Sequence, residues 1–237
     1  MKSNKEIKKI AKRAAAMSRG KLIGLSLSSL LLGGVNLLLF LFTQTGLLYV
    51  SMGLHADAFG DRTAGAKYLY LFLAVYLIVS VFIGGFVELG FNRIMLLRLR
   101  EEPVPKGTLF CCRPVWFNAL TLRLFMAIRV VLWSFLLIVP GITAMLNYSM
   151  APYLMAQNPK MDPAHAIRIS KHLMKGYKGQ LVKLLLSFSD EIIISIITLG
   201  FPFVYVIPRM KMAVAAFYRE RVMMHDEEIR KLQGNPA

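Results

Sequence analysis

The sequence predicts an all-α membrane protein: a polytopic bundle of six transmembrane helices with both termini in the cytoplasm, plus basic amphipathic helices at the membrane surface. Three observations lead to this fold class. Hydrophobic residues make up 56% of the 237 residues, above the roughly 45–50% of a soluble domain. Several apolar runs reach the roughly 20 residues that a helix needs to cross a bilayer. The Lys and Arg residues gather between these runs, as they do in cytoplasmic loops.

The positive charge of the chain is a topology signal in this interpretation. The net charge is +16, which is high enough to raise the question of nucleic-acid binding. A nucleic-acid binder would carry its basic stripe on a polar, foldable domain. Because the charges here lie in short segments between apolar runs, we expect no nucleic-acid partner.

The first quarter of the chain predicts a basic amphipathic helix over residues 1–20, followed by a membrane span over residues 22–42. The apolar stretch that begins at Leu22 extends to Val50, far beyond the roughly 7–15 residues of a signal-peptide core. We therefore expect this span to be retained. A second span is predicted over residues 68–87.

Two longer apolar runs each predict a hairpin of two spans. Pro140-Gly141 interrupts the first run and Gly200-Phe201-Pro202 interrupts the second, and such residues break or end helices. The fourth span is short enough that a re-entrant helix is the alternative. The predicted spans of the two hairpins are residues 120–139, 142–156, 181–199 and 201–218, and residues 219–237 form a cytoplasmic tail.

The distribution of basic residues supports six crossings within a single domain, residues 1–237. With this topology, 23 of the 29 Lys and Arg residues lie in cytoplasmic segments. Only Arg62 and Lys67 lie in the external loop. If either hairpin crossed once, a basic segment would lie outside, against the positive-inside rule. We expect a location in the cell inner (plasma) membrane.

Two basic amphipathic helices are predicted on the cytoplasmic surface. The first is the N-terminal helix, with Ile7 and Ile10 on its apolar face. The second covers residues 162–176, where Asp162 is the expected N-cap and Pro163 lies in the first turn. Its apolar face carries Ala166, Ile167, Ser170 and Met174.

Helices of this kind bind anionic lipid headgroups through their basic face. The alternative is that both helices only cap the bundle from below. The expected lipid-surface contacts are Lys8, Lys9, Lys12, Arg13, Arg168, Lys171 and Lys175.

Charged residues within the last predicted hairpin are the strongest functional signal. Asp190 and Glu191 lie nine to ten residues before Gly200, and Arg209 and Lys211 lie nine to eleven residues after it. At 1.5 Å per residue, both sets lie about 15 Å deep, near the middle of the bilayer. A lone charge there costs roughly 2.5–3.5 kcal/mol. We therefore predict an acid–base cluster between the fifth and sixth helices.

Three further charged residues are candidates for this cluster. Arg129 lies eleven residues before Pro140 and is expected at a similar depth, where Asp190 or Glu191 could pair with it. Arg123 lies nearer the cytoplasmic boundary, and Glu88 is its nearest candidate partner. The cluster is either a polar cavity for a substrate or lipid, a proton relay, or a structural ion-pair network that sets helix register.

The glycines and cysteines have simpler interpretations. Gly84, Gly85 and Gly90 are expected to let the second span pack closely against its neighbours. Cys111 and Cys112 are adjacent in a cytoplasmic segment, where we expect small buried or interfacial thiols. No disulfide framework or metal site is expected, because no His or second Cys pair stands at ligand spacing.

Several short stretches of the second half of the chain occur in a recognisable order. They are Leu136–Ile142, Tyr148–Tyr153, Asn158-Pro159, Ala166-Ile167 with Ser170, Leu173–Lys178, Pro208 and Ala215–Arg219. With these stretches the chain resembles a group of bacterial integral membrane proteins that is catalogued as domain of unknown function 975, most strongly from Pro140 to Arg219. The resemblance implies a six-helix bacterial inner-membrane protein and implies no activity. Asp190-Glu191 and Arg209 depart from the apolar and aromatic residues of that pattern.

Two functions follow from these predictions. The first is the binding or transport of a lipid or small amphiphile through the buried acid–base cluster. The alternative is a non-catalytic membrane scaffold or accessory subunit, with a membrane-protein partner or a second copy of the chain, in which the charges are structural. No phosphate-binding loop or hydrolase motif is found in the sequence, so we expect neither enzymatic activity nor a cofactor.

Overall fold

The computed structural model of the protein describes residues 6–10, 24, 27–29, 71, 75, 82–105, 107–136, 138–197 and 203–225. Every regular element in this part of the chain is helical, so the all-α prediction is confirmed there. The elements are α6 (Gly84–Leu99), the 3₁₀ turns η1 (Thr108–Phe110) and η2 (Arg113–Val115), α7 (Trp116–Leu136), α8 (Ile138–Tyr148), α9 (Ala151–Gln157), α10 (Pro163–Leu173), α11 (Lys178–Leu186), α12 (Ser189–Ile197) and α13 (Phe203–Met224).

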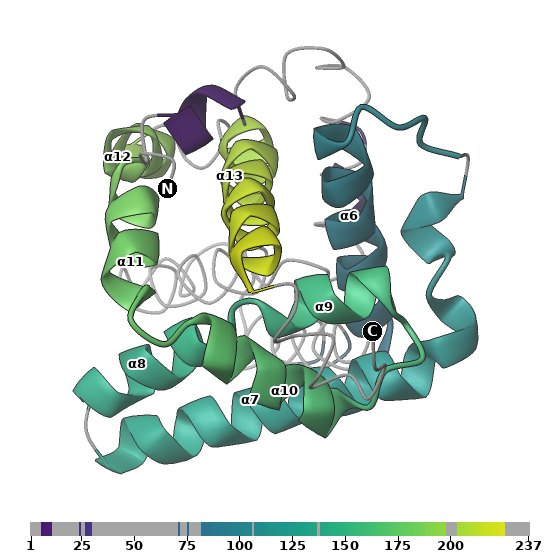
Figure 1. The fold of residues 1–237 in the computed structure, drawn as a ribbon, viewed down its shortest axis with the longest axis horizontal. Helices are drawn as coiled ribbons and strands as arrows, with labels where there is room; N and C mark the ends of the chain where they lie inside the picture. Colours follow the sequence, from purple (N-terminus) through teal and green to yellow (C-terminus); the bar gives the residue numbers. More distant parts are fainter. Residues whose placement is uncertain are drawn as a thin grey trace, which may run out of the picture.

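Helix α13 is central to the described fold. It stands between α11 and α6 in Figure 1, and it contacts both of them as well as α12. The hairpin of α7 and α8 lies along the lower edge of this view and runs across the direction of α6, α11 and α13 (Figure 1). The core lies where these two directions meet, and α9 and α10 fill the space between them.

One helix is long and apolar enough to cross a membrane among the residues that the structure describes. It covers Thr108–Trp133, that is η1, η2 and most of α7 taken as one helical stretch, and only 11% of its most apolar window is buried inside the protein. Most of the predicted spans over residues 22–42 and 68–87 fall outside the described residues. The six-span topology therefore stays a prediction.

Close packing at the glycines of α6 agrees with the expectation for this segment. A Cβ atom added at Gly90 would lie 2.0 Å from the carbonyl oxygen of Leu109 in η1. One added at Gly85 would lie 3.2 Å from the backbone of Ala119 in α7. The backbone of α6 thus approaches η1 at Gly90 so closely that only hydrogen fits, and it approaches α7 at Gly85 closely enough that a methyl group would be tight. Gly84 is buried on the same helix.

The middle hairpin turns earlier than predicted. Helix α7 ends at Leu136 and α8 begins at Ile138, so the break precedes Pro140-Gly141. Pro140 is the third residue of α8, where its missing N–H has no acceptor one turn earlier in the helix. Proline therefore begins the second helix of this hairpin.

The predicted fourth span, residues 142–156, is divided in two. Helix α8 ends at Tyr148 and α9 begins at Ala151. The Ser170 hydroxyl of α10 satisfies the backbone at this break, because it donates to the Asn147 carbonyl at 2.7 Å and accepts from the Met150 N–H at 3.1 Å. The two helices have 11 and 7 residues, and each is shorter than the roughly 20 residues of a span.

The predicted fifth span, residues 181–199, is also divided. Helix α11 ends at Leu186 and α12 begins at Ser189. The Ser187 hydroxyl donates to the Leu184 carbonyl at 2.6 Å, and such a bond competes with the regular helix. Phe188 is buried at the break, where it anchors the turn in the core.

Candidate functional site

The predicted charges of the last hairpin lie where α13 meets α12 and α6. Arg209 and Lys211 are two residues apart on α13, so they leave the helix about 200° apart and contact different neighbours. Arg209 Nη1 donates to Glu191 Oε2 of α12 at 2.7 Å. Lys211 Nζ donates to Glu88 Oε1 of α6 at 3.2 Å. Two ion pairs therefore connect α13 to two separate helices.

Both ion pairs are largely shielded from solvent. The side chains of Arg209 and Glu191 are 15% and 26% exposed, and those of Lys211 and Glu88 are 25% and 22% exposed. The guanidinium of Arg209 also lies 5.3 Å from the ring centre of Tyr205. Charges at this level of burial attract each other more strongly than surface pairs, and a single charge left there is costly.

The pairing of Glu88 differs from the prediction, which named Arg123 as its nearest candidate partner. Glu88 and Lys211 are separated by 123 residues, and no sequence periodicity reports which helices become neighbours over such a distance. Only the packing of α6 against α13 brings them together. Arg123 itself is half-buried on α7.

Asp190 and Arg129 lie outside the two ion pairs. Asp190 is exposed, and its carboxylate accepts a hydrogen bond from the Ser189 hydroxyl at 3.3 Å. Because adjacent helical residues point about 100° apart, Asp190 and Glu191 cannot both face α13. Arg129 is exposed on α7, and no ion pair joins it to Asp190 or Glu191 in the described part of the chain.

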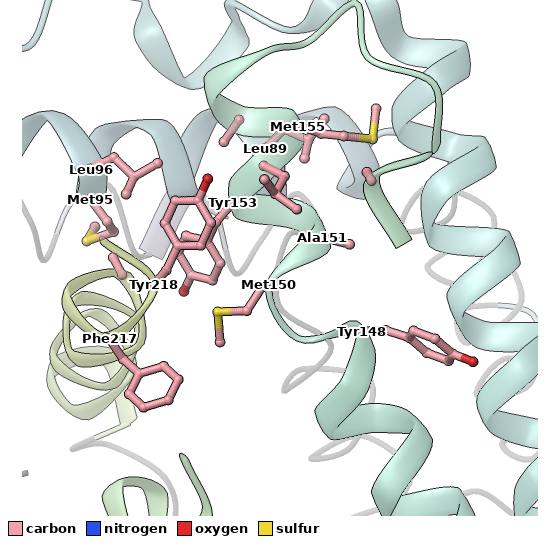
Figure 2. Close-up of a cluster of buried hydrophobic side chains, with 14 of the residues drawn as sticks. Leu89, Met95, Leu96, Tyr148, Met150, Ala151, Tyr153, Met155, Phe217 and Tyr218 are labelled. Carbon is pink, nitrogen blue, oxygen red and sulfur yellow. The ribbon is translucent and has the colours of Figure 1, made fainter. Parts of the chain in front are cut away.

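Two stacked tyrosines lie beside the Lys211 pair and were not predicted. The rings of Tyr153 from α9 and Tyr218 from α13 lie 5.6 Å apart with an interplanar angle of 24°. Figure 2 shows them between Leu96 and Met150. The Tyr153 hydroxyl donates to the Lys211 carbonyl at 3.2 Å, and the Tyr218 hydroxyl donates to Gln157 Oε1 at 2.8 Å. These contacts fix α9 against the turn of α13 that carries the charges.

Arg221 is a second group that the sequence did not single out, since it was assigned to the cytoplasmic tail. Its side chain is completely buried. The guanidinium lies 3.9 Å from the ring centre of Tyr177, and Nη2 donates to Gln180 Oε1 at 3.3 Å. Helix α13 continues to Met224, so Arg221 lies on the same helix as the charged pairs and is buried beyond the predicted span.

Helix α10 (Pro163–Leu173) lies within residues 162–176, where the sequence predicts an amphipathic helix. The Asp162 carboxylate accepts from the His165 N–H at 3.0 Å as an N-cap, and Pro163 follows in the first turn. The predicted apolar face is buried against the neighbouring helices. The exposed basic residues of α10 and the turn after it are Arg168, Lys171 and Lys175.

The N-terminal basic residues divide into two groups. Lys8 donates to the Ser187 carbonyl and lies 4.5 Å from the ring centre of Phe188, so it contacts the protein itself. Ile7 is buried beside it, and Lys9 is exposed. Lys12 and Arg13 lie outside the described residues.

The fold and site of the described residues define a class: an all-α arrangement with an exposed apolar hairpin and ion pairs along its central helix. Residues 123–223 match the model of a family described as Protein of unknown function (DUF975), which confirms the resemblance noted in the sequence. No curated protein and no solved structure matches the chain. Among the described residues, no group of three or more His, Cys, Asp or Glu side chains is placed to hold a metal ion.

Proposed function

We propose that this protein is a non-catalytic scaffold or accessory subunit of the bacterial inner membrane, in which the charges of α13 are structural ion pairs. The observation that carries the proposal is the pairing of Arg209 with Glu191 and of Lys211 with Glu88. Each cation has a carboxylate from another helix, so the pairs hold α6, α12 and α13 in one register. In a site that binds a charged substrate, at least one of these charges would be left without a carboxylate or cation partner in the protein, so that it could pair with the substrate.

The α7–α8 hairpin supports a position within the bilayer. Large apolar side chains cover its outer face, and Leu132, Phe135 and Val139 are 67%, 86% and 71% exposed. Soluble monomers rarely expose contiguous apolar surface of this kind, because each such side chain left in water forgoes roughly 1.5–3 kcal/mol of burial. Hydrocarbon is the environment that suits this face.

The basic face of α10 supports contact with anionic headgroups. Because the apolar face of α10 is buried in the protein, the helix is held rigidly with Arg168, Lys171 and Lys175 exposed. Basic residues near an anionic membrane surface contribute about 1 kcal/mol each. The helix thus both caps the fold and presents its charges to lipid.

A double-mutant cycle on Glu191→Gln and Arg209→Gln tests the structural role of the pair. We expect a coupling of about 1–2 kcal/mol in the stability of the detergent-solubilised protein, between the values for surface and buried pairs. The matched control is Arg100→Gln with Glu102→Gln, a pair 3.9 Å apart whose side chains are 49% and 47% exposed, for which we expect no measurable coupling. Equal coupling in both cycles would contradict the proposal.

The second candidate function is the binding or transport of a lipid or amphiphile through the same cluster. The partial exposure of the Glu191 and Glu88 side chains, 26% and 22%, favours it. The charge reversal Glu191→Arg with Arg209→Glu separates the two functions. A structural pair survives reversal, so a folded protein that still complements a deletion strain supports the scaffold, whereas a folded but inactive protein supports binding.

The two cysteines provide a test of the predicted orientation. Cys111 is exposed and Cys112 is buried, so a membrane-impermeant maleimide should label one site per chain. We expect labelling in inside-out vesicles and none in intact cells with a permeabilised outer membrane. Cys111→Ser should abolish the labelling and Cys112→Ser should leave it. Labelling from the external side would overturn the cytoplasmic assignment of this segment.

A further inference from the structure

Three open pockets of about 380, 460 and 510 Å³ lie next to one another between the C-terminal end of α6, the loop that follows it, and the turn that joins α9 to α10. Together they form a groove in which a few charged and amide side chains stand among apolar ones. Arg93 and Glu102 line both the first and the second pocket. Cys111 lines the second and the third, and Asn158 lines the first and the third. Because each pocket shares residues with the other two, one ligand can occupy more than one of them.

The groove carries unneutralised positive charge. Its lining includes the cations Arg93, Arg100 and Lys160 and the carboxylate Glu102, so three positive charges and one negative charge give +2. Arg100 lies 3.9 Å from Glu102, with both side chains nearly half exposed. Within the described residues, no carboxylate is paired with Arg93 or Lys160. Arg93 and Lys160 are therefore available to bind an anion, whereas Arg209 and Lys211 of α13 are already paired with carboxylates.

Two side-chain amides complete the donor set. The Gln157 carbonyl oxygen accepts from the Tyr218 hydroxyl at 2.8 Å, and among the described residues the amide NH₂ group of Gln157 has no hydrogen-bond acceptor. Asn158 follows it and is exposed in the groove. The first pocket thus combines guanidinium and amide donors, and Lys160 shares the adjoining third pocket with Asn158. Donors of these kinds are the groups that bind phosphate oxygens.

We infer that this groove binds the phosphate monoester group of a ligand. A phosphate monoester carries a charge of about −1.5 to −2 at pH 7, which matches the +2 of the lining, whereas a phosphodiester carries only about half as much charge. The predicted topology places both walls of the groove on the cytoplasmic side. The phosphate can therefore belong to a lipid headgroup such as phosphatidic acid or to free phosphate in the cytoplasm.

The test compares two double variants of the full chain in non-ionic detergent. Arg93→Gln with Lys160→Gln removes two charges from the groove. Lys178→Gln with Lys183→Gln removes two charges from α11, where neither residue lines the three pockets. Binding of inorganic phosphate is measured by calorimetry. Binding of phosphatidic acid, with phosphatidylglycerol as the diester control, is measured as lipid retained in mixed micelles.

We expect the groove variant to bind its probe at least about tenfold more weakly and the α11 variant to bind within about twofold of the wild type. Binding of phosphatidic acid alone would identify a lipid source, and binding of inorganic phosphate would identify a soluble source. The inference is overturned if the wild type binds neither probe, if both double variants lose binding equally, or if phosphatidylglycerol binds as well as phosphatidic acid.

Folding of the variants is checked by circular dichroism. If the Arg93 substitution prevents folding, Lys160→Gln alone is compared with Lys183→Gln, since both side chains are exposed and their loss disturbs no packing. The same loss of binding is expected on a smaller scale. The groove does not include Glu191 or Arg209. If the phosphate-binding inference is overturned, the proposed role of the ion pairs is therefore unchanged.

Discussion

Gly90→Ala is expected to lower the free energy of unfolding by about 3 kcal/mol or more, at the upper end of overpacking effects. The added methyl group would lie 2.0 Å from the carbonyl oxygen of Leu109 and 2.6 Å from its carbonyl carbon. Both atoms belong to the backbone of η1, so no change of side-chain rotamer relieves the clash. The η1 turn would have to move away from α6, and the buried contacts of both elements would open.

Thermal unfolding of the purified protein measures this effect against two matched substitutions. Gly179→Ala lies near the start of α11 with no atom within 4 Å of the new Cβ, and alanine there should be neutral or stabilising by up to about 1 kcal/mol. Gly85→Ala, with its Cβ 3.2 Å from the Ala119 backbone, should fall between the two. Equal melting temperatures for Gly90→Ala and Gly179→Ala would contradict the observed approach of α6 to η1.

The second large effect is expected for Tyr218→Ala, which should destabilise the protein by about 3–5 kcal/mol, as for other buried aromatic residues. Tyr218 is completely buried, and its ring stacks on Tyr153. Its removal would leave a cavity between α9 and α13 in the middle of the core shown in Figure 2. The loss of the Tyr153 contact would also loosen the backbone at Lys211, to which the Tyr153 hydroxyl is bonded.

The matched control is Tyr218→Phe, which keeps the ring and removes only the hydrogen bond to Gln157. We expect a loss of about 1 kcal/mol, the usual value of one such bond. Chemical and thermal unfolding should rank the wild type, Tyr218→Phe and Tyr218→Ala in that order. If Tyr218→Phe were as unstable as Tyr218→Ala, the hydrogen bond and not ring packing would dominate this contact.

Local features of the fold could be predicted from the sequence where residues within a few positions of one another determine them. Asp162 and Pro163 start α10 because an N-cap acceptor and a proline suit the first turn of any helix. The apolar spacing over Ala166 and Ile167 identified the buried face of α10. The Glu191–Arg209 pair was also predictable, since residues equally far from the turn of a hairpin lie at matched height.

Features that depend on a neighbour distant in sequence could not be predicted in this way. Proline suits the first turn of a helix as well as a break between helices, so Pro140 alone does not indicate which of the two it forms. In the structure it lies in the first turn of α8. The division between α8 and α9 depends on Ser170, which is 20 residues beyond Met150. A continuous apolar run carries no sign that a hydroxyl from another helix will satisfy the backbone at its centre.

Sequence alone determined the helical class of the described residues, the amphipathic face of α10 and the charged positions along α12 and α13. Only the tertiary structure decided that Glu88 is the partner of Lys211, that Arg221 belongs to the core, and that α7 and α8 run across α6 and α13. The reason is physical. Periodicity and capping act within a few turns of one helix, whereas pairing and burial are set by which helices pack together, and the apolar surfaces of this chain allow many such packings.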